Sequence, residues 1–124
     1  MVRKICLDST VLINLLNNDA GTLKQLASLE GTFCTTSINT FELWLGRKHQ
    51  EPVSDLLGSL EEFSLNPSEA RRAADIHREL KKSGNTLDLR DLFIGAICIY
   101  NEMPLLTNNQ KHFERLTKFG LMLV

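Results

Sequence analysis

The sequence predicts an α/β fold in which a central, mainly parallel sheet of about five strands is flanked by helices. Two observations carry this prediction. Short β-prone or apolar runs alternate along the chain with segments whose apolar residues recur at helical spacing. Turn and cap residues separate most of these segments, and such alternation is typical of parallel strands whose connecting helices cover both faces of the sheet.

The first half of the chain contains two predicted strands and four predicted helices. They are a strand at Val2 to Leu7, helices at Ser9 to Leu16 and around Leu23 to Leu29, a strand at Thr32 to Thr36, and helices from Ser37 to about Arg47 and from Pro52 to about Glu62. Ser37 is the expected N-cap, because its hydroxyl can accept from an unpaired backbone N–H. Pro52 is tolerated in the first turn of a helix.

The second half adds three predicted strands and two predicted helices. They are a strand at Phe63 to Leu65, a helix that starts at Asn66-Pro67-Ser68-Glu69 and runs to Lys82, a helix from Asp88 to about Tyr100, and strands at Pro104 to Thr107 and Leu121 to Val124. Ser83-Gly84-Asn85 stops the first of these helices. The run Leu92 to Ile99 is apolar around the whole helix, which predicts a central position.

Composition indicates one globular domain over residues 1–124. Hydrophobic residues make up 43% of the chain and charged residues 23%, which excludes a disordered or collagen-like protein. The formal net charge of -1 gives no overall basic signature. Any contact with nucleic acid must therefore come from local basic clusters or from metal ions in an acidic pocket.

Cysteine usage and the N-terminus predict a cytoplasmic protein. Cys6, Cys34 and Cys98 are odd in number and fall in expected core segments, so we expect no disulfide, and their spacing does not suggest zinc. The N-terminus leads straight into a strand rather than a signal peptide. The longest apolar run is too short to span a bilayer, so no membrane segment is expected.

Polar residues follow two of the predicted strands. Asp8 comes directly after the first strand, and Thr107, Asn108 and Asn109 close the strand that begins at Pro104. The carboxyl ends of parallel strands form the ligand crevice of such sheets, so both motifs lie at the correct edge for a site. The alternative for Asp8 is that it serves only as an N-cap, and the second motif, taken alone, is more typical of a polar turn than of a ligand.

Glu42 lies among apolar residues of a predicted helix. Ile38, Phe41, Glu42 and Leu45 occupy positions i, i+3, i+4 and i+7. A carboxylate buried in such a stripe needs a cation, hydrogen bonds or a raised pKa. The alternative is a Glu at the helix edge, paired with Arg47 or exposed. Trp44, on the same helix, is either deeply buried or part of a partner surface.

Asp91 begins the apolar run of the central helix, so its carboxylate is expected at a buried helix N-terminus. Asp88 and Asp91 are three positions apart, so the alternative is a capping arrangement. In it Asp88 is the N-cap and the charge of Asp91 interacts favourably with the helix dipole, and this alternative fits Asp88 better than Asp91. Gly95, one turn later, leaves space for a ligand or a neighbouring backbone. His112, a single histidine, is more often structural or exposed than catalytic.

The chemistry of these residues favours a hard divalent cation. Mg²⁺ and Mn²⁺ prefer carboxylate, carbonyl and water oxygens, and in proteins they usually act on phosphate. If the polar motifs at Asp8, Glu42, Asp91 and Thr107 to Asn109 converge, the sequence therefore predicts phosphate-ester chemistry.

The motifs together resemble a known family. They are Leu7-Asp8-Ser9-Thr10-Val11-Leu12-Ile13, Thr36-Ser37-Ile38-Asn39-Thr40-Phe41-Glu42-Leu43, Arg90-Asp91-Leu92-Phe93-Ile94-Gly95-Ala96, and Leu106-Thr107-Asn108-Asn109 with His112-Phe113. In this order and spacing they resemble the PIN domain, and more closely the VapC toxins of prokaryotic toxin–antitoxin modules. The resemblance covers nearly the whole chain.

The resemblance implies a PIN-like fold and a Mg²⁺- or Mn²⁺-dependent endoribonuclease that is usually homodimeric and is inhibited by a VapB-like antitoxin. It assigns the acidic metal-binding positions to Asp8, Glu42 and Asp91. Thr107 matches the hydroxyl residue that supports the site, and Ser9 and Thr10 match polar residues of which one orients the first Asp. The family's fourth acidic position falls on Asn109, which removes one charge and puts a tightly held second metal in doubt. Asp88 is an extra carboxylate that could offset this loss.

The expected reaction is hydrolysis of an RNA phosphodiester by a metal-activated water. Because the metal ligands are acidic, surrounding cations must position the RNA, and Lys48, Lys111 and Arg115 are the candidates. Sequence-specific recognition usually targets single-stranded loops, so we expect a folded RNA with an exposed loop as substrate.

Two other classes of function stay open at this point. A haloacid-dehalogenase-like phosphatase also begins with strand-Asp-x-Thr, but it would need a second Asp at Thr10 and usually a longer chain. A non-catalytic PIN-like RNA-binding protein is favoured by Asn109 and by the weak basic character. Cleavage of a generic RNA and of a small phosphate ester, measured together with thermal protection by divalent metal, distinguishes the three.

Overall fold

A parallel four-stranded sheet forms the centre of the molecule. The computed structural model describes residues 3–46 and 50–124. The strands are β1 (Lys4–Leu7), β2 (Thr32–Thr36), β3 (Glu61–Phe63) and β4 (Leu105–Leu106), in the order β3-β2-β1-β4, and every neighbouring pair is parallel. The predicted fold class is therefore confirmed, with four strands rather than about five.

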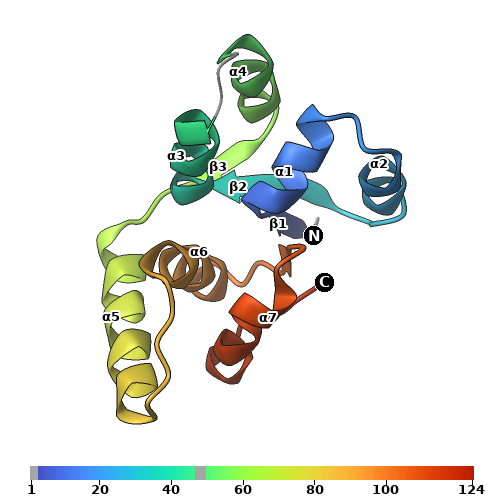
Figure 1. Ribbon diagram of the computed structural model, residues 1–124. Helices are drawn as coiled ribbons and strands as arrows, with labels where there is room; N and C mark the ends of the chain where they lie inside the picture. The colour runs from blue at the N-terminus through green and yellow to red at the C-terminus, as the bar shows by residue number, and fades with distance from the viewer. Residues whose placement is uncertain (1–2, 47–49) are drawn as a thin grey trace.

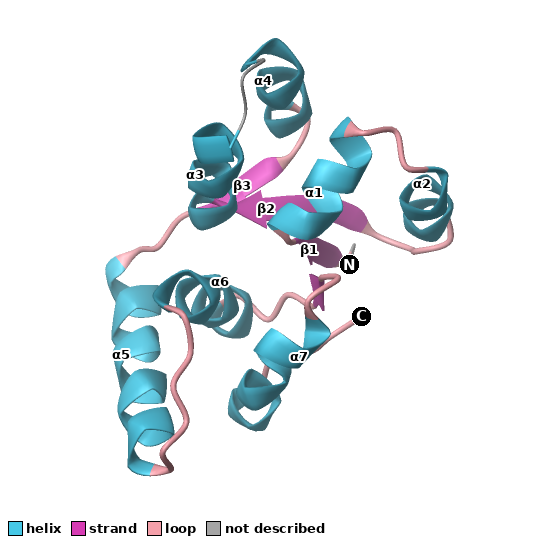
Figure 2. Ribbon diagram, viewed as in Figure 1, coloured by secondary structure: helices cyan, strands magenta, loops and turns pink. Residues whose placement is uncertain are grey.

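Helices cover both faces of this sheet (Figures 1 and 2). They are α1 (Ser9–Leu16), α2 (Ala20–Ala27), α3 (Ser37–Gly46), α4 (Gln50–Gly58), α5 (Pro67–Lys82), α6 (Leu89–Tyr100), α7 (Gln110–Phe113) and the 3-10 helix η1 (Glu114–Phe119). In Figure 1 the helices α1 to α4 lie on one side of the sheet, and α5, α6 and α7 lie on the other.

Alternation along β1 builds a separate core on each face. Ile5 and Leu7 pack into a cluster with Val11, Leu12 and other residues of the α1–α4 layer. Cys6 points the other way, into a cluster that contains α5, α6 and η1 side chains. Successive strand residues point to opposite faces, so a strand without polar alternation must be covered on both sides.

Parallel pairing brings the polar strand ends together. Leu7 of β1 is in register with Leu106 of β4, and the Asp8 N–H donates to the Leu106 carbonyl at 3.0 Å. The residues that follow these strands, Asp8 and Thr107, are consequently neighbours. β2 ends at Thr36 on the same edge, where α3 begins.

Two predicted elements differ from the structure in the region that follows α3. The helix predicted from Pro52 to Glu62 begins at Gln50 and ends at Gly58, and Glu62 belongs to β3 instead. The strand predicted at Phe63 to Leu65 is therefore shifted to Glu61–Phe63. Pro52 still lies in the first turn of the helix, where its missing N–H costs nothing.

The last predicted strand is not formed. Leu121 to Val124 contributes a single parallel bridge, between Leu123 and Leu105, beside the two-residue strand β4. Another correction concerns Gly95. Its missing side chain accommodates neither a ligand nor a backbone, since a Cβ there would collide with the Leu116 side chain.

The other core predictions are confirmed. Leu92, Ile94, Ala96, Ile97 and Cys98 of α6 are all buried. The three cysteines are free and buried, as expected. Within the described ranges, no helix has the length and apolar character needed to cross a membrane.

Candidate active site

Asp8 is the most deeply held carboxylate at this edge of the sheet. Only 4% of the residue is exposed. Its Oδ2 accepts a hydrogen bond from the Thr107 hydroxyl at 2.6 Å, and its Oδ1 accepts from Asn39 Nδ2 at 3.0 Å. Asp8 precedes α1 without capping it through its side chain, so the N-cap alternative does not account for its carboxylate. The protein holds this buried charge through neutral donors.

Asn39 connects three of the polar motifs, and the sequence interpretation assigned it no role. The side chain is fully buried, and its Nδ2 donates to Asp8 and also to Ser9 Oγ at 2.9 Å. Its Oδ1 accepts from the Thr36 hydroxyl at 2.7 Å. The usable signal was the i, i+4 pair Asn39 and Leu43, which is the buried face of α3.

Thr36, rather than Ser37, caps α3. The Thr36 hydroxyl accepts from the backbone N–H of Asn39 at 3.2 Å, which is the bond expected of an N-cap when the helix begins at the next residue. Thr36 therefore serves both the helix end and the Asn39 side chain.

Glu42 lies at the edge of this network. Its side chain is 22% exposed. Oε1 accepts from the Ser9 hydroxyl at 2.7 Å, and Oε2 lies 3.7 Å from Arg90 Nη1. Phe41 and Leu45 are exposed and Ile38 is partly buried against the core, so the stripe is only half-buried, and Glu42 has the hydrogen bond and the nearby cation expected for its carboxylate. The expected pairing with Arg47 lies outside the described residues.

Asp91 lies in the first turn of α6, across the site from Glu42. Burial raises the pKa of its carboxyl to about 6, and the negative charges of Asp8, Asp88 and Glu42 act in the same direction. His112 Nδ1 lies 3.6 Å from Asp91 Oδ2 and partly opposes the shift when protonated. Both the burial of Asp91 and the neighbouring acids therefore disfavour its charged form in the metal-free protein.

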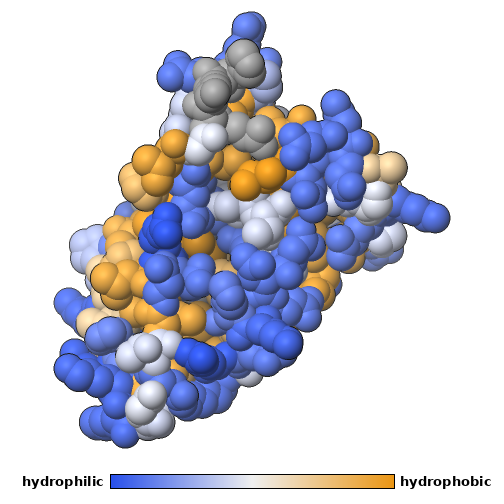
Figure 3. All heavy atoms as spheres, viewed as in Figure 1, coloured by the Kyte–Doolittle hydropathy of each residue, from blue (hydrophilic) through white to orange (hydrophobic). Residues whose placement is uncertain are grey.

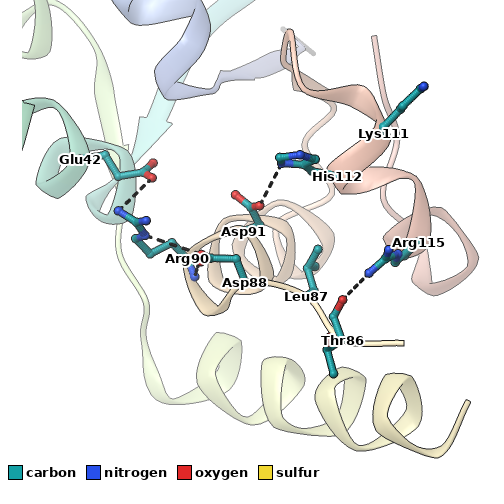
Figure 4. Close-up of a pocket in the computed structure, with 9 residues that line it drawn as sticks. All are labelled: Glu42, Thr86, Leu87, Asp88, Arg90, Asp91, Lys111, His112 and Arg115. Atoms are coloured by element: carbon teal, nitrogen blue, oxygen red, sulfur yellow. Dashed lines mark hydrogen bonds and ion pairs between the residues drawn. The ribbon is translucent and has the colours of Figure 1, made fainter. Parts of the chain in front are cut away.

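A pocket of about 520 Å³ opens beside these acids (Figure 4). It is lined by Glu42, Thr86, Leu87, Asp88, Arg90, Asp91, Lys111, His112 and Arg115. Figure 4 shows the acidic side chains towards α3 and the start of α6, and Lys111 and Arg115 on the α7 and η1 side. One pocket thus combines an acidic end with a basic end.

The donor set suits a hard cation, although the side chains do not surround one. Within residues 3–46 and 50–124, no three His, Cys, Asp or Glu side chains are close enough together to hold a metal ion. Each acid instead contacts a protein donor, such as Thr107 or Arg90. Mg²⁺ usually keeps several waters and needs only one or two carboxylates, so a spread set of oxygens with uncompensated negative charge fits such an ion.

The remaining predicted site residues are Asp88, Ser9, Thr10 and Asn109, and they differ in how closely they contact the acids. Asp88 caps α6 by accepting from the Arg90 N–H at 2.9 Å and also lines the pocket. Thr10 contacts Asp8 only at 3.4 Å, whereas Ser9 binds Glu42. Asn109 has an exposed side chain, and its N–H donates to Thr107 Oγ1.

Among the predicted RNA contacts, Lys111 and Arg115 line the pocket. Arg115 also donates to the carbonyl of Thr86. Lys48 lies outside the described residues.

An apolar patch lies on α3 beside the site. Phe41, Trp44 and Leu45 are 54%, 38% and 69% exposed. Figure 3 shows hydrophobic surface over this helix. Of the two interpretations of Trp44, the partner surface is therefore the better one.

Known proteins are similar to this chain in both sequence and fold. The family model of the PIN domain matches residues 5–118. Ribonuclease VapC1 of Methanocaldococcus jannaschii is 34% identical over 119 residues, which cover 95% of this chain and 85% of that protein. Ribonuclease VapC2 of Haemophilus influenzae is 26% identical over 121 residues, 91% of this chain and 92% of that protein.

The fold is also found in solved toxin–antitoxin complexes. A chain of VapBC2 from Rickettsia felis, crystallised with a DNA fragment from its promoter, superposes with a TM-score of 0.79 at 25% identity. The match covers 98% of this chain and 97% of that chain. The resemblance stated from the motifs is therefore confirmed.

Proposed function

The chain belongs to the PIN domain family, and from this membership we propose that it is an endoribonuclease that hydrolyses RNA phosphodiester bonds as the toxin of a VapBC-type pair. The relatives named ribonuclease support RNA as the substrate. The observation that carries the proposal is the convergence of Asp8, Glu42 and Asp91 from three separate segments on one edge of the sheet, where burial and then the charges of the neighbouring acids raise the pKa of Asp91.

We assign the metal positions to Asp8, Glu42 and Asp91, with Mg²⁺ or Mn²⁺ as the ion. A bound divalent cation would supply an activated water and would stabilise negative charge on the phosphate. Asp8 is oriented for this role by Thr107 and Asn39, so its oxygens are held in position before an ion arrives. Asp88 adds negative charge to the same pocket and offsets the amide at Asn109.

Substrate binding is assigned to the basic end of the pocket. Lys111 and Arg115 are one helical turn apart in sequence and line the wall opposite the acids. Their charges attract the phosphates that flank the bond to be cut, while Leu87 offers an apolar contact for a base. An acidic chain thereby holds an anionic substrate without an overall positive charge.

The proposed partners are a VapB-like antitoxin and a second copy of the chain. The solved VapBC complexes share the fold over nearly the whole length, which supports the antitoxin. The exposed patch Phe41, Trp44 and Leu45 supports a homodimer, because a two-fold dimer is the commonest closed solution for one apolar patch. We expect the protein to act in the cytoplasm, where its RNA substrate is found.

Cleavage of a generic RNA and of a small phosphate ester, each with Mg²⁺, with Mn²⁺ and with EDTA, tests the function. We expect metal-dependent cleavage of the RNA and no turnover of the ester. Cleavage should be lost in Asp91→Asn and retained in Asp75→Asn, which makes the same substitution on the exposed face of α5. Turnover of the ester alone would indicate a phosphatase, and turnover of neither would indicate a binding protein.

A further inference from the structure

Arg90 lies between Glu42, a proposed metal ligand, and Asp88, which lines the same pocket. Its Nη1 is 3.7 Å from Glu42 Oε2, and its Nε is 3.6 Å from Asp88 Oδ1. Figure 4 shows the guanidinium reaching from the first turn of α6 towards α3, at the acidic end of the pocket. A cation thus already neutralises part of the acidic cluster.

Stability alone gives a weak reason for this arrangement. Arg90 is in the first turn of α6, where the helix dipole disfavours a positive charge. Its side chain is 48% exposed, and ion pairs of this exposure contribute little to stability. The chain therefore places a cation where its own helix disfavours it and where the acids of the site hold it.

The pair engages an oxygen that a metal needs. Glu42 Oε1 is already bound by the Ser9 hydroxyl, which leaves Oε2 as the oxygen that faces Arg90. A divalent cation at Glu42 Oε2 and the Arg90 guanidinium would both carry positive charge within a few ångströms of each other. Binding of the ion must therefore weaken the hold of Glu42 on Arg90.

We propose that Arg90 is a built-in counter-ion of the metal site, displaced from Glu42 when a divalent cation binds and then free to contact a phosphate of the RNA in the pocket. The inference rests on the function proposed above. The pocket already contains Lys111 and Arg115, so a released guanidinium completes a cationic lining for the phosphate chain. Guanidinium binds phosphate through paired N–H donors, which makes Arg suited to this second position.

Metal and RNA binding are then coupled through one side chain. A metal ion releases Arg90 and so strengthens RNA binding, and by reciprocity RNA that holds Arg90 strengthens metal binding. Removing the charge should improve metal binding and abolish this part of the coupling. A variant that merely damaged the fold would weaken both metal binding and RNA binding.

The test compares Arg90→Gln with two matched variants. Arg78→Gln removes the same charge from an exposed pair with Asp75 on α5, outside the pocket. Lys111→Gln removes a pocket cation that forms no ion pair with an acid in the described structure. Mn²⁺ affinity is measured by calorimetry at low ionic strength. Binding of a fluorescent RNA oligonucleotide with phosphorothioate linkages is measured by anisotropy with and without Mn²⁺.

Arg90→Gln should bind Mn²⁺ about fivefold more tightly than the wild type, which corresponds to the upper end of the free energy of a partly exposed ion pair. The Mn²⁺ affinity of Arg78→Gln should stay within about twofold of the wild type. Mn²⁺ should also enhance RNA binding less in Arg90→Gln than in the wild type. Lys111→Gln should weaken RNA binding without the gain in Mn²⁺ affinity.

Two results would overturn the inference and leave the proposed function standing. One is Mn²⁺ affinity in Arg90→Gln no greater than in Arg78→Gln. The other is an equal gain in Lys111→Gln, which would indicate general charge rather than the Arg90–Glu42 pair. A wild-type protein that neither binds Mn²⁺ nor cleaves RNA would overturn both proposals.

Discussion

The Thr107 hydroxyl donates a 2.6 Å hydrogen bond to Asp8 Oδ2 across a sequence separation of 99 positions. Parallel pairing of β1 with β4 makes this contact, because the two residues follow strand positions that are in register. Asn39 holds the other oxygen of the same carboxylate. The carboxylate at the centre of the proposed site is thus fixed from two sides before any ligand binds.

Removing the Thr107 hydroxyl should loosen Asp8. Thr107→Val keeps the shape but leaves a buried acceptor without its donor, which should cost about 1–3 kcal/mol of unfolding free energy and reduce RNA cleavage at least tenfold. Thr107→Ser retains the donor and is the control. Urea unfolding and initial cleavage rates measure both effects, and equal behaviour of the two variants would show that the hydrogen bond does not matter.

Asn39 should be as important as the acids although it carries no charge. Asn39→Ala removes two donors from Asp8 and Ser9 and the acceptor for Thr36, so we expect a loss of about 2–3 kcal/mol and a strong loss of cleavage. Asn85→Ala, at an exposed Asn after α5, is the matched control and should change stability by less than about 0.5 kcal/mol. Retained activity in Asn39→Ala would contradict a role in holding Asp8.

The sequence predicted the residues at the strand ends and the helix acids Glu42 and Asp91, but it missed Asn39 on α3. Asp8 and Thr107 come directly after strands, and strand ends converge in any parallel sheet. On α3 the apolar stripe is only half-buried, since Phe41 and Leu45 are exposed, and the fully buried face presents Asn39. Hydrophobic spacing cannot distinguish a core stripe from an interface stripe, because both are apolar.

Arg90 illustrates a second limit. Its position in the first turn of α6 is visible in the sequence, but its contact with Glu42 depends on how α6 packs beside α3. Packing also explains why residue 95 is a glycine, because the Leu116 side chain from η1 occupies the space that a Cβ would need. Such contacts between segments far apart in the chain leave no local signal.

The raised pKa of Asp91 makes the stability of the metal-free protein depend on pH. The folded protein holds a proton up to about pH 6, whereas the unfolded chain releases it near pH 4, so folding binds protons in this interval. The favourable contribution is therefore present below about pH 4 and is lost as the pH rises through 6. Allowing for partial exposure, the loss is about 2 kcal/mol.

Asp91→Asn should remove this dependence and, with EDTA present, unfold at higher urea concentration than the wild type at pH 7. RNA cleavage should be abolished in the same variant. Unfolding free energies at several pH values measure the difference between the two proteins, which isolates Asp91 from the other acids. Parallel curves for wild type and variant would contradict the raised pKa of Asp91.

The apolar patch on α3 should mediate self-association. Trp44→Glu places a charge among Phe41 and Leu45, and we expect it to convert a dimer into a monomer at micromolar concentration with the fold intact. Leu23→Glu is the control, because Leu23 is 50% exposed on α2. Light scattering measures the mass, and a wild-type protein that is already monomeric would contradict the prediction.

Inhibition by an antitoxin should depend on the metal concentration. The site contains four acids, Asp8, Glu42, Asp88 and Asp91, and Arg90 offsets only part of their charge. A flexible peptide that folds along the apolar surface and presents an Arg or Lys to these acids gains Coulomb attraction and charge-assisted hydrogen bonds. It would then compete with the cation for the same oxygens.

Raising Mg²⁺ against a fixed amount of toxin–antitoxin complex should therefore restore cleavage, with a half-maximal concentration that falls when the basic residue of the peptide is replaced by Gln. Ionic strength is kept constant with a monovalent salt, because screening alone also weakens the attraction. Restoration by Mg²⁺ but not by the monovalent salt indicates competition at the acids. Inhibition that stays constant over the whole titration would instead indicate that the antitoxin blocks the pocket sterically, and the acids would then contribute nothing specific to its recognition.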